Sequence, residues 1–193
     1  MRWDIRRVVA FLLLIAVSVG FGFAFDAAAT AIERRNHPRP EALAEPIAAY
    51  AKEFGIPETI LWAVAYQSSG FASNAVAEDG AVGLMQLTPA QFTFITQEIL
   101  GEQTHDTGLL YDPDTNLRCG AAWLSYLYEH YSVWDLTFAA YRVGTETVDA
   151  WLTDPDYTDE EGRLTEIPDR KVASYVKQME QAVESYRTLY YEP

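Results

Sequence analysis

Apolar residues at helical spacing, with very little of the alternation typical of strands, are the feature of this sequence that most restricts its fold. From residue 45 onward, apolar positions recur three or four residues apart, as they do on one face of a helix. Residues 70–87 are the exception, because this segment is rich in Gly and Ala. The pattern predicts an all-α domain with one small loop that is either irregular or a β-ribbon.

Local signals predict where the helices begin and end. Thr88-Pro89-Ala90-Gln91 and Ser132-Val133-Trp134-Asp135 have the residue types of capping boxes, and Gly55 and Gly144 are typical helix stops. Helices are predicted at residues 45–54, 57–69, 88–101 and 132–144, and the longest one begins at Asp112-Pro113 and continues through Tyr128. A short helix around Val148 and Trp151 and a last helix through Val172 and Val183 follow.

The N-terminus combines positive charge with a long apolar run. Arg2, Arg6 and Arg7 precede the 18 uncharged residues 8–25, a length at the short end of the range for a membrane-spanning helix. Arginines before such a run place the N-terminus in the cytoplasm and the remainder outside. Small residues after the run also allow a cleaved signal peptide. We expect a single-pass anchor in the cell membrane with an extracytoplasmic domain, or a secreted protein after signal cleavage.

The sequence therefore divides into three parts. Residues 1–31 are predicted to be a membrane anchor or signal segment. Residues 32–42 are polar, contain two prolines and are predicted to be a linker. Residues 43–193 are predicted to form one domain.

The net charge excludes one large class of partner. The whole chain carries −14, and because the first 25 residues contribute +2, residues 26–193 carry −16. Such a domain repels phosphate backbones, so no nucleic acid is expected as a partner. An acidic surface favours solubility and would also suit a basic partner, so binding to proteins of the cell wall stays open.

No metal or other cofactor is expected. The single cysteine, Cys119, falls on an apolar helical face and is interpreted as a small buried hydrophobic residue. The histidines, His37, His105 and His130, are scattered, and the spacing of a Cys/His metal site does not occur.

Four sequence motifs that follow one another along the chain are its most informative feature. Residues 65–89 contain Ala-Tyr-Gln-Ser-Ser-Gly-Phe, then Asn-Ala-Val, then Gly-Ala-Val-Gly-Leu-Met-Gln-Leu-Thr-Pro. Further motifs are Asn-Leu-Arg-Cys-Gly at 116–120, Ala-Ala-Tyr-Arg-Val-Gly at 139–144, and Ile167-Pro168 followed by Tyr175-Val176. Their order and spacing resemble the signature of bacterial lytic transglycosylases, of the soluble-lytic-transglycosylase or goose-lysozyme-like type, over residues 43–190.

The resemblance implies a lysozyme-like helical fold and a groove for the glycan strands of peptidoglycan. In that family one glutamate protonates the glycosidic oxygen between N-acetylmuramic acid and N-acetylglucosamine, then helps the muramic 6-hydroxyl to form a 1,6-anhydro end. Glycines let the backbone approach a sugar, and tyrosines offer flat faces with a hydroxyl. Met85 and Tyr175 also fit simple core packing. The residues implied in substrate binding are Ser69, Gly83, Met85, Gln86, Tyr141, Arg142, Lys171 and Tyr175.

Three polar positions depart from the family pattern. Ser68 stands where the catalytic glutamate is expected, Arg142 where the family has asparagine, and Lys171 where it has glutamate. A serine hydroxyl is too weak an acid to protonate a leaving group near neutral pH, so Ser68 is expected to be non-functional in catalysis. We expect a degenerate member, a pseudoenzyme that binds glycan strands without efficient cleavage. The alternative is an active lytic transglycosylase with a relocated acid, for which Glu78 is the candidate.

Overall fold

The computed structural model describes residues 5–104 and 106–192, and the chain divides into two compact units between Pro38 and Arg39. The first unit contains the helix α1 (Ile5–Asn36). The apolar run predicted to span a membrane lies in this helix, but among the described residues no helix is long and apolar enough to do so. The first four residues of the predicted anchor, and His105, lie outside the described residues.

The second unit is a domain of helices joined by loops. In chain order its elements are η1 (Glu41–Leu43), α2 (Ala44–Glu53), α3 (Glu58–Ser69), α4 (Pro89–Phe94), the π-helical turn η2 (Ile95–Ile99), η3 (Thr107–Tyr111), α5 (Pro113–Tyr131), α6 (Trp134–Val143), α7 (Thr145–Thr153) and α8 (Arg170–Tyr190). Over residues 5–104 and 106–192 there are helices and isolated β-bridges but no extended strand, so the predicted all-α class is confirmed.

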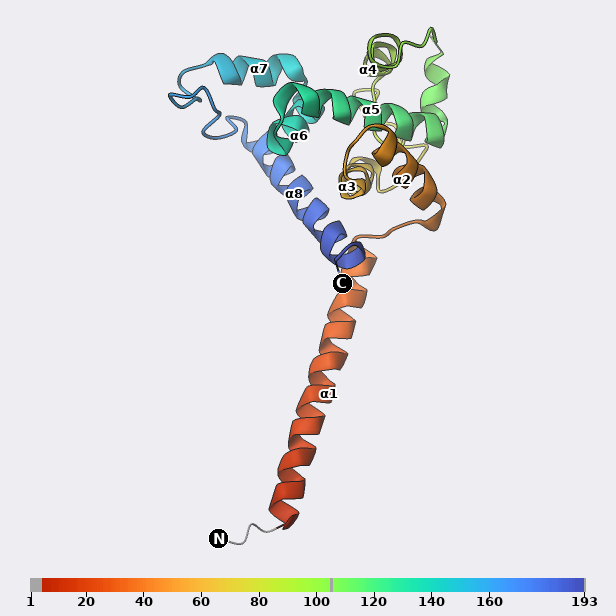
Figure 1. Cartoon of the computed structure of the whole chain (residues 1–193). Helices are drawn as coiled ribbons and strands as arrows, with labels where there is room; N and C mark the ends of the chain where they lie inside the picture. Colours follow the sequence, from red (N-terminus) through yellow and green to blue (C-terminus); the bar gives the residue numbers. More distant parts are fainter. Residues whose placement is uncertain (1–4, 105, 193) are drawn as a thin grey trace. The chain divides into compact units, whose positions relative to one another are not determined.

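Helix α3 lies at the centre of the domain. It packs against α2 and α8, while α6 contacts α5, α7 and α8 (Figure 1). Every residue from Ile60 to Ala65 is buried, and Trp62 stacks on Tyr186 of α8 with ring centroids 6.1 Å apart. Burial of this much apolar surface is the main driving force for folding. It also fixes the last turn of α3, where the candidate site begins.

The segment between α3 and α4 folds back on itself as a small irregular ribbon. Isolated β-bridges join Val76 to Val82 and Val82 to Leu87. A further bridge joins Thr158 to Leu164 in the loop before α8. The loop therefore has the ribbon-like character that was predicted for it.

Of the two predicted capping boxes, one is present in the structure and the other is not. At α4, the Thr88 hydroxyl accepts the Gln91 backbone N–H and the Gln91 side chain accepts the Thr88 N–H, so this box is confirmed. Ser132 instead ends α5 with φ 56°, and Val133 precedes α6 without a side-chain cap. The second prediction is wrong, because an N-cap residue needs an extended backbone and Ser132 has a left-handed one.

The compact domain begins at Arg39, inside the segment predicted as a linker. The Arg39 guanidinium carbon lies 5.2 Å from the ring centroids of Trp62 and Tyr191 and 5.6 Å from that of Tyr190. A guanidinium nitrogen also lies 3.8 Å from the Glu58 carboxylate. Arg39 thus connects the start of the domain to α3 and to the end of α8.

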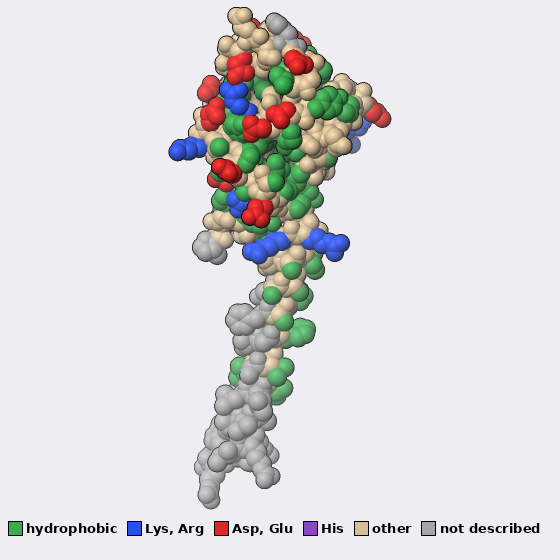
Figure 2. Space-filling model, turned by 90° about the vertical axis from the view of Figure 1, so that its right-hand side faces the viewer, with side chains coloured by type: hydrophobic (Ala, Val, Ile, Leu, Met, Phe, Trp, Pro, Cys, Tyr) green, Lys and Arg blue, Asp and Glu red, His purple; other side chains and the backbone are tan. Residues whose placement is uncertain are grey.

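The surface of the domain is acidic, as its composition predicts. Figure 2 shows Asp and Glu side chains spread over one face, among uncharged and hydrophobic ones, with fewer Lys and Arg side chains. Excess charge of one sign favours solubility.

Candidate functional site

Helix α3 ends in a sharp turn that places Ser68 beside the following loop. Ser69 is the last helical residue, Gly70 has φ 60° and Phe71 has φ 67°, both left-handed conformations. The Phe71 ring meets Trp62 edge-on with a centroid distance of 5.8 Å. This aromatic contact supports the unusual backbone of Phe71 and thereby fixes the exit from the helix.

One buried side-chain amide, that of Asn116, holds the loop between α3 and α4 in place. Asn116 of α5 is fully buried, accepts the Met85 backbone N–H at 2.8 Å, and donates to the carbonyls of Val82 and Leu110 at 2.9 Å each. Both amide hydrogens and the amide oxygen are used, as a buried polar group requires. This positioning role of Asn116 was not predicted from its motif, although an asparagine on an otherwise apolar helical face was a usable signal.

Gly83 lies against that amide, and no other residue fits there. Its φ is 83°, and a Cβ atom would lie 2.3 Å from Asn116 Nδ2 and 2.8 Å from the Leu110 carbonyl oxygen. Gly83 therefore allows the close contact between the loop and α5. It is buried within the loop.

Ser69 and Tyr141 bind the same loop through its carbonyl groups. The Ser69 hydroxyl donates to the Leu84 carbonyl at 2.9 Å, and the Tyr141 hydroxyl donates to the Met85 carbonyl at 2.6 Å. The Met85 side chain is fully buried and lies against Gly120 of α5. These contacts give Ser69 and Met85 a structural role in shaping the groove.

Gln86 combines loop support with a polar group that a ligand can reach. It has φ 50°, and its side-chain nitrogen donates to the carbonyls of Gly83 at 2.9 Å and Ala75 at 3.1 Å. Among the described residues, no donor bonds to the amide oxygen of Gln86. That oxygen is therefore available to accept a hydrogen bond from a hydroxyl or an acetamide.

Five predicted site residues come together around one cavity of about 240 Å³, which we call the Ser68 cavity. They are Ser68, Gln86, Tyr141, Arg142 and Tyr175. The other residues that line it are Gln67, Ala77, Asp79, Ala81, Thr88 and Gln91. Ser69, Gly83 and Met85 are not among the lining residues, since they hold the loop from its inner side.

A second cavity, of about 700 Å³, adjoins the first. Lys171, the remaining predicted site residue, lines it together with Arg170 at the start of α8. Asp79, Arg142 and Tyr175 line both cavities, so the two form one continuous groove. The Arg142 guanidinium carbon lies 5.7 Å from the Tyr175 ring centroid, a cation–π contact that holds the cation at the junction.

The carboxylate that lines the Ser68 cavity is not the predicted one. Asp79, and not Glu78, lines the Ser68 cavity, and it is the only carboxylate among the described lining residues. Asp79 is exposed and accepts the Ala81 backbone N–H at 3.1 Å. The general acid of a glycosidase lies in a water-poor, apolar setting, and the exposed Asp79 side chain lacks that setting.

Burial keeps the two groove tyrosines protonated. It raises the pKa of Tyr141 well above its ordinary value. It also raises the pKa of Tyr175, against the opposing effect of the Arg142 charge. Both hydroxyls are therefore hydrogen-bond donors at neutral and alkaline pH and cannot serve as bases.

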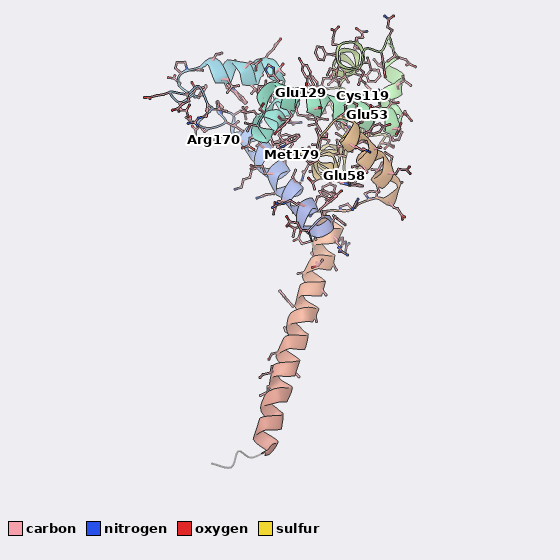
Figure 3. All side chains as sticks on the ribbon, viewed as in Figure 1. Glu53, Glu58, Cys119, Glu129, Arg170 and Met179 are labelled. Carbon is pink, nitrogen blue, oxygen red and sulfur yellow. The ribbon has the colours of Figure 1, made fainter. Side chains whose placement is uncertain are left out.

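Cys119 and the remaining ligand-type residues do not contribute a reactive centre. Burial raises the pKa of Cys119 on α5 to about 11, so the thiol stays protonated, as expected of a buried apolar residue (Figure 3). Within the described part of the chain, no three His, Cys, Asp or Glu side chains gather in a way that could hold a metal ion.

The groove thus has the means to bind a polar ring-shaped ligand. Amide and hydroxyl groups line it beside a flat tyrosine face. Ser68 has no hydrogen-bond partner among the described residues, and neither His nor Lys occurs among those that line its cavity. A serine becomes a nucleophile only with such a base beside it.

Fold and groove together define a lysozyme-like helical domain with a site for an extended polar ligand. The chain belongs to the transglycosylase SLT domain family, whose model matches residues 45–162. The predicted family is confirmed.

Relatives agree in sequence and in structure. The soluble lytic murein transglycosylase of Escherichia coli K12 is 30% identical over 124 residues, 63% of this chain and 19% of that protein. The Salmonella typhimurium protein of the same name is 28% identical over 130 residues, 66% of this chain and 20% of that one.

Two solved structures share the fold. An inactive mutant of the lytic transglycosylase Slt from Pseudomonas aeruginosa matches with a TM-score of 0.71 and 28% identity, over 83% of this chain and 26% of that chain. The 70 kDa soluble lytic transglycosylase from Escherichia coli matches with a TM-score of 0.70 and 26% identity, over 81% and 25%. This chain spans about a fifth of the curated relatives and about a quarter of these structures.

Proposed function

We propose that residues 39–193 bind the glycan strands of peptidoglycan and cleave them inefficiently or not at all. The observation that carries the proposal is the presence of Ser68 in the last turn of α3. Ser68 faces the groove at the position where the family resemblance places a glutamate, and the cavity around it offers no buried carboxylate. Relatives named as murein transglycosylases support peptidoglycan as the ligand.

The chemistry of the lining residues explains the expected loss of cleavage. Breaking a glycosidic bond requires a proton for the leaving oxygen, and a well-placed general acid typically contributes roughly 10²–10⁴-fold to the rate. The Ser68 hydroxyl is too weak an acid, and burial holds the protons on the two groove tyrosines. The intact loop and its available polar groups still support binding.

The direct test is digestion of purified peptidoglycan by the full-length protein. We expect no 1,6-anhydro-muropeptides from the wild type by mass spectrometry, while the protein sediments with insoluble peptidoglycan. Ser68→Glu restores a carboxyl group at the end of α3 and is expected to release a small amount of product. Ser68→Gln is the matched control, because it has nearly the same size but no acid, and it should release none.

Two results would contradict the proposal. Release of anhydro products by the wild type as fast as by Ser68→Glu would show that position 68 is not needed. Failure of the wild type to sediment with peptidoglycan would remove glycan binding itself.

A second candidate function is an active lytic transglycosylase whose acid has moved. The observation that favours it is Asp79, a carboxylate that lines both cavities. If Asp79 supplies the proton, wild type releases product and Asp79→Asn abolishes it. Glu78→Gln is the control, since Glu78 is not among the residues that line either cavity. Equal product yields from Asp79→Asn and wild type would remove this candidate.

We further propose that residues 1–31 export the domain, as a single-pass membrane anchor or as a cleaved signal peptide. The supporting feature is the order of three arginines followed by the uncharged run 8–25. An uncleaved anchor predicts intact mass and retention in membranes washed at high pH, whereas signal cleavage predicts a shortened, soluble product. A full-length protein found with the cytoplasmic fraction would contradict both.

A further inference from the structure

Most arginines of the domain form ion pairs with carboxylates. Four of them have a carboxylate oxygen within 2.6–3.8 Å of a guanidinium nitrogen: Arg39, Arg118, Arg163 and Arg187. Among the described residues from 39 onward, the arginines without such a partner are Arg142 and Arg170. Both line the 700 Å³ cavity, and Lys171 lines it as well. The unpaired guanidinium groups of this strongly acidic domain are therefore concentrated in the groove, whereas the lysines outside it, Lys52 and Lys177, are isolated single charges.

The three cations approach the cavity from two helices. Arg142 lies in the last turn of α6, whereas Arg170 and Lys171 begin α8, where Figure 3 labels Arg170. The contact between Arg142 and the Tyr175 ring restricts one guanidinium at the junction with the Ser68 cavity. A restricted guanidinium loses less entropy when it binds a carboxylate through two parallel N–H···O bonds.

Two carboxylates also line this cavity, and both are bound by backbone donors. Asp169 accepts the N–H groups of Lys171 at 2.7 Å and Val172 at 3.2 Å, as the cap of α8. Asp79 accepts the Ala81 N–H at 3.1 Å. Neither carboxylate forms an ion pair with the cavity's cations in the described contacts. The cations outnumber the carboxylates here, in contrast to the rest of the domain.

We propose that this cavity is a carboxylate subsite, which makes the groove prefer glycan strands that carry carboxylate groups. The inference rests on the proposed binding of a glycan strand in the adjoining Ser68 cavity. Two groups on such a strand have this chemistry: the lactyl carboxylate of muramic acid without peptide, and the carboxylates of an attached peptide. A strand of N-acetylglucosamine alone has neither.

The test compares three oligosaccharides of matched length with full-length protein in detergent. One is a chitin oligosaccharide, the second alternates N-acetylglucosamine with peptide-free N-acetylmuramic acid, and the third carries the peptides. We expect titration calorimetry to show that at least one carboxylate-bearing ligand binds roughly 10- to 100-fold more tightly than chitin, as charge-assisted hydrogen bonds imply. The ligand that shows the preference identifies the source of the carboxylate.

Variants assign the preference to this cavity. Arg142→Gln combined with Arg170→Gln should bring the carboxylate ligands to within a few-fold of chitin, so the measured quantity is the ratio of the carboxylate-ligand affinity to the chitin affinity of the same variant. Arg187→Gln is the control, because this exposed arginine is paired with Glu184 and does not line the groove. It should leave all three affinities unchanged.

The possible failures are distinguishable. Equal binding of all three ligands would overturn the carboxylate subsite but leave glycan binding in place. A preference that survives the double substitution would overturn the assignment to Arg142 and Arg170. If none of the oligosaccharides binds, the proposed function fails, and the subsite fails with it.

Discussion

Side chains around the groove fall into two groups, according to whether their polar atoms form hydrogen bonds with the protein. Asn116, Ser69 and Tyr141 bond to the backbone of the loop between α3 and α4, within residues 82–85. Ser68 and Arg142 have no hydrogen bond to the protein in the described contacts, although both line the Ser68 cavity. Substitutions in the first group should therefore lower stability, and substitutions in the second should change binding or chemistry.

Gly83→Ala tests the closeness of the loop to α5. The new Cβ would overlap the Asn116 amide and the Leu110 carbonyl, and the left-handed backbone would add strain. We expect a loss of roughly 2–5 kcal/mol in the free energy of unfolding, measured in urea. Gly55→Ala is the matched control, because Gly55 also has positive φ but nothing lies within 4 Å, so it should lose only about 1–2 kcal/mol. Equal losses would mean that the contact with Asn116 is unimportant.

Arg142 should lower the protonated fraction of any carboxyl group that is restored at position 68. Both positions line the same cavity, and a neighbouring guanidinium lowers the pKa of a carboxyl group, which would leave Ser68→Glu ionised at neutral pH. We expect Ser68→Glu to release product best at acidic pH, and Ser68→Glu with Arg142→Asn to extend that activity upward by about one pH unit or more. Rates of muropeptide release against pH measure this. Identical pH profiles for the two variants would show that Arg142 does not act on position 68.

Motif spacing predicted which residues line the groove better than it predicted their roles. Ser68, Gln86, Tyr141, Arg142 and Tyr175 do meet around one cavity. The sequence did not show whether Glu78 or Asp79 lines the groove, because the backbone turns of the loop decide where two adjacent side chains point. Hydrogen bonds between distant segments, such as those of Asn116, likewise have no periodic signature in the sequence.

At the level of helices, capping residues predicted helix ends correctly wherever the backbone has the conformation that the cap requires. Asp112 caps α5 through the Thr115 N–H, with Pro113 in the first turn, as such a pair predicts. The helix predicted for residues 88–101 divides after Phe94, where a π-helical turn follows. Ser132 has the residue type of an N-cap but serves as the end of α5. The loop between α5 and α6 has two residues, and the backbone geometry makes Ser132 the end of α5 and leaves Val133 in front of α6.

Substitutions at the two predicted caps should therefore have unequal effects. Thr88→Ala removes the two hydrogen bonds that the Thr88 hydroxyl forms with Gln91, leaves the one from the Thr88 backbone N–H, and should lower the free energy of unfolding by about 1 kcal/mol. Ser132→Ala removes no cap and should change stability by less than about 0.5 kcal/mol. Urea unfolding of both variants beside wild type measures the difference. A loss at Ser132 as large as that at Thr88 would contradict the assignment.

On the scale of the whole molecule, the abundance of tyrosine controls stability in alkali. Burial raises the pKa of several tyrosines, and for Tyr50 and Tyr191 the pKa rises to about 12, with the neighbouring carboxylates of Asp114 and Glu58 adding to the effect. In the unfolded chain a tyrosine ionises near pH 10. The folded protein therefore retains more protons than the unfolded chain above that pH, and stability must fall as pH rises.

We expect the free energy of unfolding to begin to fall near pH 9, where the Cys119 thiol ionises in the unfolded chain, and to decline more steeply above about pH 10, where the tyrosines follow. Urea unfolding at several alkaline pH values measures the decline, and phenolate absorbance should rise together with unfolding. Tyr50→Phe removes one of the responsible groups and should make the decline shallower. Stability that does not change up to about pH 11 would contradict the predicted role of these tyrosines.

The aromatic cluster around Arg39 has a mechanical consequence. Tension that enters the domain along the chain from the N-terminal side reaches Arg39 first, where the rings of Trp62, Tyr190 and Tyr191 and the Glu58 carboxylate resist it. Glu58 and Ser68 stand near opposite ends of α3, roughly 15 Å apart at about 1.5 Å per residue. Under the proposed anchoring by residues 1–31, a pull on the anchor would therefore act a full helix length away from Ser68.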